Sequence, residues 1–296
     1  MWIQPCSEHL YIMMSTGLKA TSFGAACALA LAFGLAGATA PVTAADPIEP
    51  GRFVWRDLMT KDVSVAERFY GELFGWRFEK TKRGDRPYVI ARSGSVPVAG
   101  IVDVSNLPDA GPQWLCFMAV ADVDKTVALA QSDGGKVLVQ PRDLPLARAA
   151  VVTDPQGAPL GLAQMRGTIP LPAQPTQGHF FWQEYLAKDA AKALDFYKRL
   201  AGYQPVISDT RLGVDYHVLM KARGGAGLFQ LPATVVGIEP NWLPYVLVDA
   251  PDQMAARVTA LGGRILVPSA PERRNGSLVV IADPGGAPLA LQKYPY

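Results

Sequence analysis

The chain has 296 residues, of which 49% are hydrophobic, 9% aromatic and 18% charged. This composition is typical of a folded globular protein and excludes disordered, collagen-like and coiled-coil classes. The 28 Lys and Arg residues nearly balance the 26 Asp and Glu residues, for a net charge of +2. The charges are interspersed, so the sequence shows neither a nucleic-acid-binding surface nor a polybasic membrane tract.

Residues 1–45 are predicted to be a secretory signal peptide. Lys19 precedes an uncharged stretch whose strongly apolar part is Phe23–Ala38, and small residues follow it. A basic residue, an apolar run and a small-residue ending are the three parts of such a signal. We expect cleavage after Ala44 or Ala45. The competing interpretation is an uncleaved membrane anchor, but the run is shorter than the ~20 residues that span a bilayer. We expect no stable membrane insertion after cleavage. The expected location is periplasmic or secreted.

The predicted mature chain is a tandem repeat. The segment 55–62 (Trp-Arg-Asp-Leu-Met-Thr-Lys-Asp) matches 182–189 (Trp-Gln-Glu-Tyr-Leu-Ala-Lys-Asp), and a Phe-Tyr pair follows each at the same spacing. The turns Asp-Pro-Gln-Gly at 154–157 and Asp-Pro-Gly-Gly at 283–286 close the two copies at nearly the same offset. Self-similarity of this kind indicates duplication. The predicted modules are 51–166 and 177–294, joined by a proline-rich linker at 167–176.

Each copy is predicted to be α+β. In the first copy the expected elements are a strand at Phe53–Met59, a helix from the cap Asp62 to Gly75, strands at Tyr88–Arg92, Val98–Val102 and Trp114–Val120, a helix at Val123–Ser132, and strands at Lys136–Val139, Ala149–Val152 and Leu160–Ala163. The first helix is indicated by apolar residues four apart, by an N-cap aspartate and by a terminal glycine. The order of elements predicts two strand–helix units of like design in each module.

These motifs resemble the vicinal oxygen chelate superfamily, which includes glyoxalase I, bleomycin- and fosfomycin-resistance proteins and extradiol dioxygenases. The similarity rests on the strand, the capping Asp, the Phe-Tyr pair, the Gly-Trp or Gly-Tyr pair and the closing Asp-Pro-x-Gly turn, all repeated in register. It implies paired βαβββ units whose curled mixed sheets enclose a cavity. In catalytic members a divalent metal in that cavity chelates two adjacent substrate oxygens.

The metal ligands of the family do not carry over to this chain. The resemblance places them at Trp55, Leu115 and Gly161 in the first copy and at Trp182, Leu243 and Ala290 in the second. None of these side chains is a carboxylate or an imidazole, the donors that such a centre needs. A site built on the two histidines left in the mature chain, His179 and His217, is not expected either. We therefore predict no metal and no other cofactor.

Asp57 and Glu184 are the candidate functional carboxylates. Each lies two residues after the tryptophan at a former ligand position, so it shares that face of its strand. From the duplication we expect the two to face one another across a pseudo-two-fold axis. They could then act as acid and base, hold a cation or bind a ligand. Alternatively, each accepts hydrogen bonds from a neighbouring arginine or backbone amide and does no chemistry.

Four aromatic residues complete the candidate site. Trp55 and Trp182 could stack on a ligand or fill the space of the lost metal, and Tyr88 and Tyr216 could add hydroxyl groups to the cavity. Two other features are expected to have no role in it. Arg273 and Arg274 are expected to be a solvated charge pair. Cys116, the one cysteine left after cleavage, is expected to be an inert core residue without a disulfide partner.

Three functions remain open at this point. The leading hypothesis is a small-molecule-binding protein without the family's metal, acting as a monomer or a homodimer. The alternative is an enzyme of the lyase, isomerase or dioxygenase type that uses Asp57 and Glu184 as acid and base or as relocated ligands of a divalent metal. The third is an interaction protein with a filled cavity. The fold does not decide among them.

Overall fold

The computed structural model describes residues 48–83, 86–107, 110–167, 176–209, 216–221, 224–235, 237–271 and 274–294. The predicted signal peptide and most of the predicted linker lie outside these residues. Within the described ranges, no helix has the length and apolar character needed to cross a bilayer.

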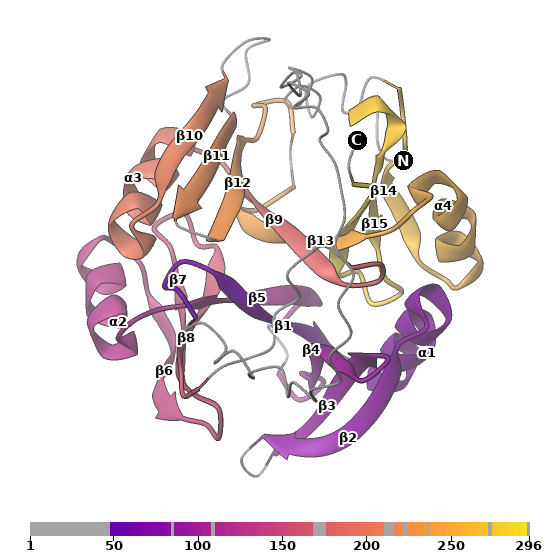
Figure 1. Cartoon of the computed structure of the whole chain (residues 1–296), viewed down its shortest axis with the longest axis horizontal. Coiled ribbons are helices and arrows are strands. Elements are labelled where there is room, and N and C mark those ends of the chain that lie inside the picture. Colours follow the sequence, from indigo (N-terminus) through magenta and orange to yellow (C-terminus); the bar gives the residue numbers. More distant parts are fainter. Residues whose placement is uncertain are drawn as a thin grey trace, which may run out of the picture.

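The two halves of the chain form the same succession of elements (Figure 1). The first half contains β1 (Phe53–Thr60), α1 (Val63–Phe74), β2 (Arg77–Arg83), β3 (Arg86–Ser93), β4 (Val96–Asp103), β5 (Gln113–Ala119), α2 (Val123–Ser132), β6 (Val137–Asp143), β7 (Ala147–Thr153) and β8 (Pro159–Met165). The second contains β9 (Phe180–Ala187), α3 (Ala190–Ala201), β10 (Gln204–Asp209), β11 (Tyr216–Lys221), β12 (Gly224–Gln230), β13 (Asn241–Leu247), α4 (Pro251–Ala260), β14 (Arg264–Val267), β15 (Leu278–Ala282) and β16 (Pro288–Gln292).

Each half builds one mixed eight-stranded sheet, and we call the halves module 1 and module 2. The strand orders are β2-β3-β4-β1-β5-β8-β7-β6 and β10-β11-β12-β9-β13-β16-β15-β14. In module 1 the pairs β1–β4 and β5–β8 are parallel and the others antiparallel, and module 2 repeats this pattern. The predicted α+β class, with two mixed sheets of paired βαβββ units, is confirmed.

One strand was missed by the sequence analysis. Strand β2 has the sequence Arg-Phe-Glu-Lys-Thr-Lys-Arg, and most of its side chains are exposed. It lies at the edge of the sheet, where only β3 pairs with it. Because an edge strand without a buried face lacks the apolar alternation that marks strands, its sequence gives no signal.

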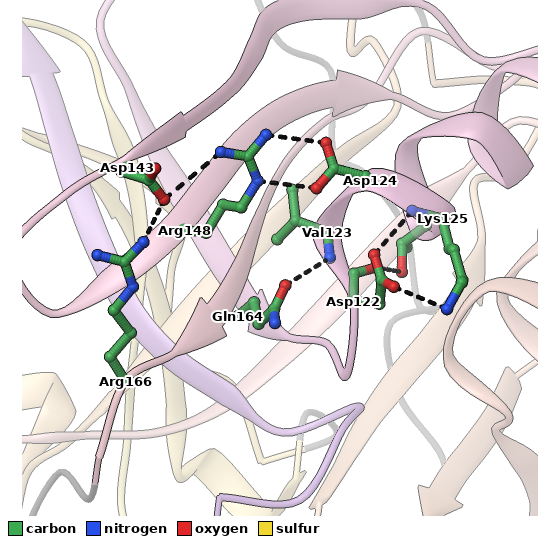
Figure 2. A network of polar contacts seen from close by, with 9 residues as sticks. Asp122, Val123, Asp124, Lys125, Asp143, Arg148, Gln164 and Arg166 are labelled. Atoms are coloured by element: carbon green, nitrogen blue, oxygen red, sulfur yellow. Dashed lines mark hydrogen bonds and ion pairs between the residues drawn. The ribbon is translucent and has the colours of Figure 1, made fainter.

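The helix ends are fixed by local contacts that the sequence does show. Asp62 caps α1 by accepting a hydrogen bond from the backbone N–H of Val65 at 3.0 Å, and Gly75 ends this helix with φ 72°. Helix α2 is held against its sheet by the polar network in Figure 2, in which Gln164 accepts from the N–H of Val123 at 3.1 Å and Arg148 forms two hydrogen bonds with Asp124. The charges of this network are largely exposed and paired with one another, so its role is to position the helix.

The helices lie at the boundary between the two sheets and help to make the two halves one folding unit. Helix α1 contacts α4 and α2 contacts α3, as Figure 1 shows at its right and left sides. Each of the two largest apolar cores combines residues of both modules. Cys116 is fully buried in one of them, and burial raises the pKa of its thiol to about 11. This agrees with its expected role as a core residue.

Arg56 and Gln183 mark the pseudo-two-fold relation at the centre of the boundary. They are equivalent residues of the repeat, and Nη2 of Arg56 donates to Oε1 of Gln183 at 2.6 Å with both side chains buried. The side chain of Gln183 also donates to the carbonyl oxygen of Gly225. Successive residues of a strand point to opposite faces. The neighbours of this pair, Asp57 and Glu184, therefore point away from the boundary.

The aspartates of the closing turns tie the modules together. Asp283 accepts from the hydroxyl of Tyr70 in the other module at 3.0 Å. Asp154 accepts from the hydroxyls of Tyr197, at 3.1 Å, and Tyr185, again in the other module. Tyr70 and Tyr197 are the tyrosines of the repeated Phe-Tyr pairs, so the duplicated motifs bind one another reciprocally. Burial raises the pKa of both aspartates, although hydrogen bonds to their oxygens oppose this effect.

We predict that Asp154 gives the protein a contribution to stability that decreases with rising pH. Its pKa in the folded state lies above the unfolded value of about 3.9, so the folded state binds more protons between the two values. The contribution is complete below the unfolded pKa and is lost as pH rises through the folded one. Urea unfolding of wild type and Asp154→Asn across this range should show a destabilisation by the substitution that becomes smaller as pH rises. A destabilisation that grew with pH would mean that the native state favours the charged carboxylate.

Candidate functional site

The positions of the family's metal ligands lie on the face of each sheet that carries no helix, which we call the helix-free face. In module 1, Trp55 pairs with Phe117 and Phe117 pairs with Gly161 across adjacent strands, and Leu115 belongs to the same apolar cluster. In module 2, Trp182, Leu243 and Ala290 belong to the corresponding cluster. These residues supply no metal donors.

In module 1 Asp57 is enclosed by a hydrogen-bonded cluster. Its carboxylate, fully buried, accepts from the hydroxyl of Tyr88 at 2.6 Å, from the indole N–H of Trp55 at 2.9 Å and from Nη1 of Arg83 at 2.5 Å. The guanidinium of Arg83 also lies 4.2 Å from the ring centroid of Tyr88. Burial, followed by the charge of Asp57, raises the pKa of Tyr88, so this hydroxyl stays protonated and donates.

In module 2 Glu184 has an analogous set of partners. It accepts from the hydroxyls of Tyr216 at 2.8 Å and Tyr245 at 2.5 Å, and Arg274 binds it through Nη2. Burial, followed by the charge of Glu184, raises the pKa of Tyr245. Burial alone would lower the pKa of Arg274, but the charge of Glu184 and the neighbouring tyrosines outweigh it and the pKa rises.

Two glycines make room for these clusters. Gly100 is the strand partner of Asp57, and a Cβ there would overlap the hydroxyl of Tyr88. Its equivalent Gly227 is the partner of Glu184, and a Cβ there would lie 2.8 Å from the hydroxyl of Tyr216. Only glycine allows this close approach of tyrosine and carboxylate. The internal repeat relates the two glycines, which was a signal available in the sequence.

The expectation that Asp57 and Glu184 face one another is wrong. The hydrogen-bond partners of Asp57 belong to module 1 and those of Glu184 to module 2. The two strands approach one another through Arg56 and Gln183, which are hydrogen-bonded. The side chains of Asp57 and Glu184 lie on the other face of their strands from this pair. The carboxylates therefore occupy two separate helix-free faces and do not form one acid–base pair. What the structure does bring together is each carboxylate with its tyrosine, Tyr88 or Tyr216.

The expectation that Arg274 is solvated is also wrong. Its side chain is 14% exposed and forms a buried ion pair with Glu184. Arg273 lies outside the described residues. Sequence analysis missed both arginine partners because they come from non-equivalent elements: Arg83 ends the edge strand β2, whereas Arg274 precedes β15. No internal repeat relates these two positions, so duplication gave no signal for them.

The two tryptophans differ in their hydrogen bonding. The indole N–H of Trp55 is shared between Asp57 and the hydroxyl of Tyr88, at 2.9 and 2.8 Å. In the part of the chain that the structure describes, no acceptor bonds to the indole N–H of Trp182. Gln292, which accepts from Arg274 at 2.5 Å, also has a buried amide nitrogen without a partner there. Among the described residues, module 2 therefore has a buried N–H donor without a partner on its helix-free face, that of Gln292, and its tryptophan lacks the hydrogen bonds that fix Trp55 in module 1.

These residues do not fit a divalent metal. Such ions need several oxygen or nitrogen donors converging on one point, and the described residues include no group of three or more His, Cys, Asp or Glu side chains that could supply them. Each candidate carboxylate is already bound by an arginine, which competes with a cation for the same oxygens.

Comparison with known proteins agrees with the fold and with the repeated motifs. The sequence model of the glyoxalase/bleomycin resistance protein/dioxygenase superfamily matches residues 52–162. A protein of Mycobacterium bovis named "Putative glyoxylase CFP32" is 32% identical over 244 residues, which cover 81% of this chain and 93% of that protein. The chain belongs to this superfamily.

Two further proteins are similar to this chain over different extents. The anthracycline biosynthesis protein DauV of a Streptomyces species (strain C5) is 32% identical over 124 residues, or 42% of this chain and 45% of that protein. The crystal structure of the Mn(II)-bound glyoxalase of Novosphingobium aromaticivorans matches with a TM-score of 0.55 and 12% identity, covering 83% of this chain and 82% of that one. At this identity the second likeness concerns the fold alone.

We predict that Arg274 is needed to stabilise the buried charge of Glu184. Removal of one partner of a buried ion pair costs about 3–5 kcal/mol, so Arg274→Ala should lower the free energy of unfolding by about that amount. Adding Glu184→Gln should recover part of the loss, because the uncompensated charge is gone. Urea unfolding of the four proteins of this double-mutant cycle measures the coupling. Equal losses with and without Glu184→Gln would contradict a stabilising pair. Arg83→Ala, at the more exposed ion pair, serves as the comparison and should cost less.

Proposed function

We propose that this is an exported superfamily member that binds a small organic molecule on the helix-free face of module 2 without the family's usual metal. The observation that carries the proposal is the buried amide nitrogen of Gln292, which has no partner among the described residues and lies on the same face as the partly buried indole of Trp182. A buried donor without an acceptor, such as the amide of Gln292, costs about 1–3 kcal/mol. A ligand that supplies acceptors would remove this cost and gain binding energy from it.

The arrangement favours a planar ligand with carbonyl oxygens. Trp182 is partly buried and offers an aromatic surface for stacking. Gln292 lies two strands away on the same face, since Trp182 pairs with Tyr245, Tyr245 with Ala290, and Gln292 follows two residues later. At about 4.8 Å between strands and about 3.3 Å per residue along a strand, the Cα atoms of Trp182 and Gln292 are roughly 12 Å apart. The name of DauV refers to anthracyclines, which are planar and rich in carbonyl groups, and this supports the same ligand class.

Module 1 has a structural role in this proposal. The indole of Trp55 is fixed by two hydrogen bonds, and Asp57 has an arginine and a tyrosine as further partners. The cluster is thus satisfied without a ligand. Its carboxylate is engaged in holding the helix-free face together, which argues against a role as general base.

We predict that 1,4-dihydroxyanthraquinone and doxorubicin, as planar carbonyl-rich probes, bind to module 2 and quench the intrinsic tryptophan fluorescence of the protein. Trp182→Leu, which removes stacking surface and donor, and Gln292→Leu should each weaken binding, by roughly tenfold for one lost hydrogen bond. The matched variant Trp55→Leu should leave the affinity within about twofold, after correction for its unfolded fraction.

The same preparation tests the absence of the metal. Metal analysis of the purified protein should find no stoichiometric divalent ion, and probe binding should not change with chelator. A stoichiometric metal that is lost in Glu184→Gln would favour the enzyme alternative. No binding of either probe at any concentration tested, together with no metal, would favour the interaction protein with a filled cavity.

We further predict that expression with residues 1–45 intact yields an exported product that begins at Ala45 or Asp46. These first residues correspond to cleavage after Ala44 or Ala45. Fractionation and N-terminal sequencing measure this. A replacement of Leu29, Leu31 and Leu35 by Asp, which interrupts the apolar run, should retain the protein uncleaved in the cytoplasm. Export of that variant would contradict the signal assignment.

A further inference from the structure

An open pocket of about 240 Å³ lies at the boundary between the modules, away from both helix-free faces. One wall is the segment that leads into α1, with Thr60, Lys61 and Asp62, and the other is the closing turn of module 2, with Asp283 and Gly285. The pocket therefore lies beside the hydrogen bond between Asp283 and Tyr70 that joins the modules.

The equivalent place on the other side of the pseudo-two-fold axis is filled by a glutamine side chain. There Gln156, in the closing turn of module 1, faces the start of α3. Its amide oxygen accepts from the backbone N–H of Asp189 at 2.8 Å, and its amide nitrogen donates to the carbonyl oxygen of the same residue at 3.0 Å. A primary carboxamide thus matches both polar groups of the backbone at this position.

The pocket exists because Gly285 stands where the other turn has Gln156. The two turns are Asp-Pro-Gln-Gly and Asp-Pro-Gly-Gly, so the second lacks the side chain. A positive φ does not require this glycine, since Gly286, not Gly285, has one. A Cβ at Gly285 would lie 3.2 Å from Oδ1 of Asp283 and 3.5 Å from Oγ1 of Thr60, which is tight but does not exclude a side chain.

Thr60 provides a weaker substitute for the missing amide. Its hydroxyl accepts from the backbone N–H of Asp62 at 3.2 Å and donates to the carbonyl oxygen of Asp62 at 3.3 Å. Both contacts are longer than those made by Gln156. The repeat has Ala187 in place of Thr60, so the hydroxyl occurs only where the glutamine is absent.

We propose that this pocket binds a small ligand with a primary carboxamide group, which takes the place that Gln156 occupies in the other half. The amide oxygen accepts from the N–H of Asp62 and the amide nitrogen donates to its carbonyl oxygen, displacing the hydroxyl of Thr60. The exposed side chains of Lys61 and Asp62 at the rim provide both signs of charge, which suits the zwitterionic end of an amino acid that has a carboxamide in its side chain. A bound ligand would contact both modules and so stabilise their association.

L-Glutamine is the probe, and amide NMR shifts of the two-module protein are the readout. We expect saturable shifts at Asp62 and Gly285 with a Kd on the order of 1–10 mM, as befits so small a molecule. L-Glutamate should bind at least about tenfold more weakly, because a carboxylate cannot donate to the carbonyl oxygen of Asp62. Propionamide, which has the amide without the charged end, should shift the same residues.

Three variants separate this site from unspecific binding. Gly285→Gln fills the pocket and should abolish the shifts, with thermal unfolding as the check of its fold. Thr60→Ala removes the competing hydroxyl, as in the other half, and should tighten binding by roughly tenfold. Gln156→Gly opens the equivalent place and should add a second set of saturable shifts at Asp189.

The proposal is overturned if wild type shows no saturable shift at Asp62 and Gly285, or if L-glutamate binds as tightly as L-glutamine. It is also overturned if Gly285→Gln keeps its fold and still binds. A result in which Gln156→Gly binds the probe but wild type does not would overturn it too, because it would mean that Thr60 has closed the site. None of these outcomes depends on ligand binding at Trp182, because the two sites share no residue.

Discussion

The reciprocal hydrogen bonds between closing-turn aspartates and tyrosines of the opposite module are the constraint on which the rest of the structure depends. A buried carboxylate needs donors, and Asp154 and Asp283 find theirs on Tyr197 and Tyr70. This fixes the helices that carry those tyrosines at the boundary between the modules. The helix-free faces are then left on the sides away from that boundary, and each must satisfy its own central carboxylate.

That arrangement explains how much the sequence could predict. The duplication, the helix caps at Asp62 and Gly75 and most strands are local patterns, and the structure has them. Asp57 and Tyr88 were both expected at the cavity, but the hydrogen bond between them was not predicted. Strand β2 was not predictable, because its exposed, charged residues carry no periodicity. The relation between Asp57 and Glu184 depends on which faces the modules bury against each other, which local patterns do not contain.

The arginine partners of Asp57 and Glu184 could not be predicted from local sequence patterns either. Both carboxylates require a cation, because isolated buried charges are costly, yet Arg83 comes from an edge strand and Arg274 from the segment before β15. Each copy of the fold thus has a buried carboxylate that needs a cation, but the arginine that supplies it comes from a different element in each copy. An internal repeat can therefore predict that a buried carboxylate exists in each half without predicting which residue neutralises it.

The differences between the halves are where binding can arise. Residues that hold the modules together, such as Tyr70 and Tyr197, occur in both and are satisfied in both. Among the described residues the indole N–H of Trp182 has no acceptor, whereas that of Trp55 is bonded, and Gly285 leaves a pocket at the place that Gln156 fills in the other half. At that pocket the backbone of Asp62 has, in place of the amide of Gln156, the longer contacts with the hydroxyl of Thr60. The satisfied copy thus indicates the chemistry that a ligand of the open copy has to provide: acceptors near Trp182 and a carboxamide near Asp62.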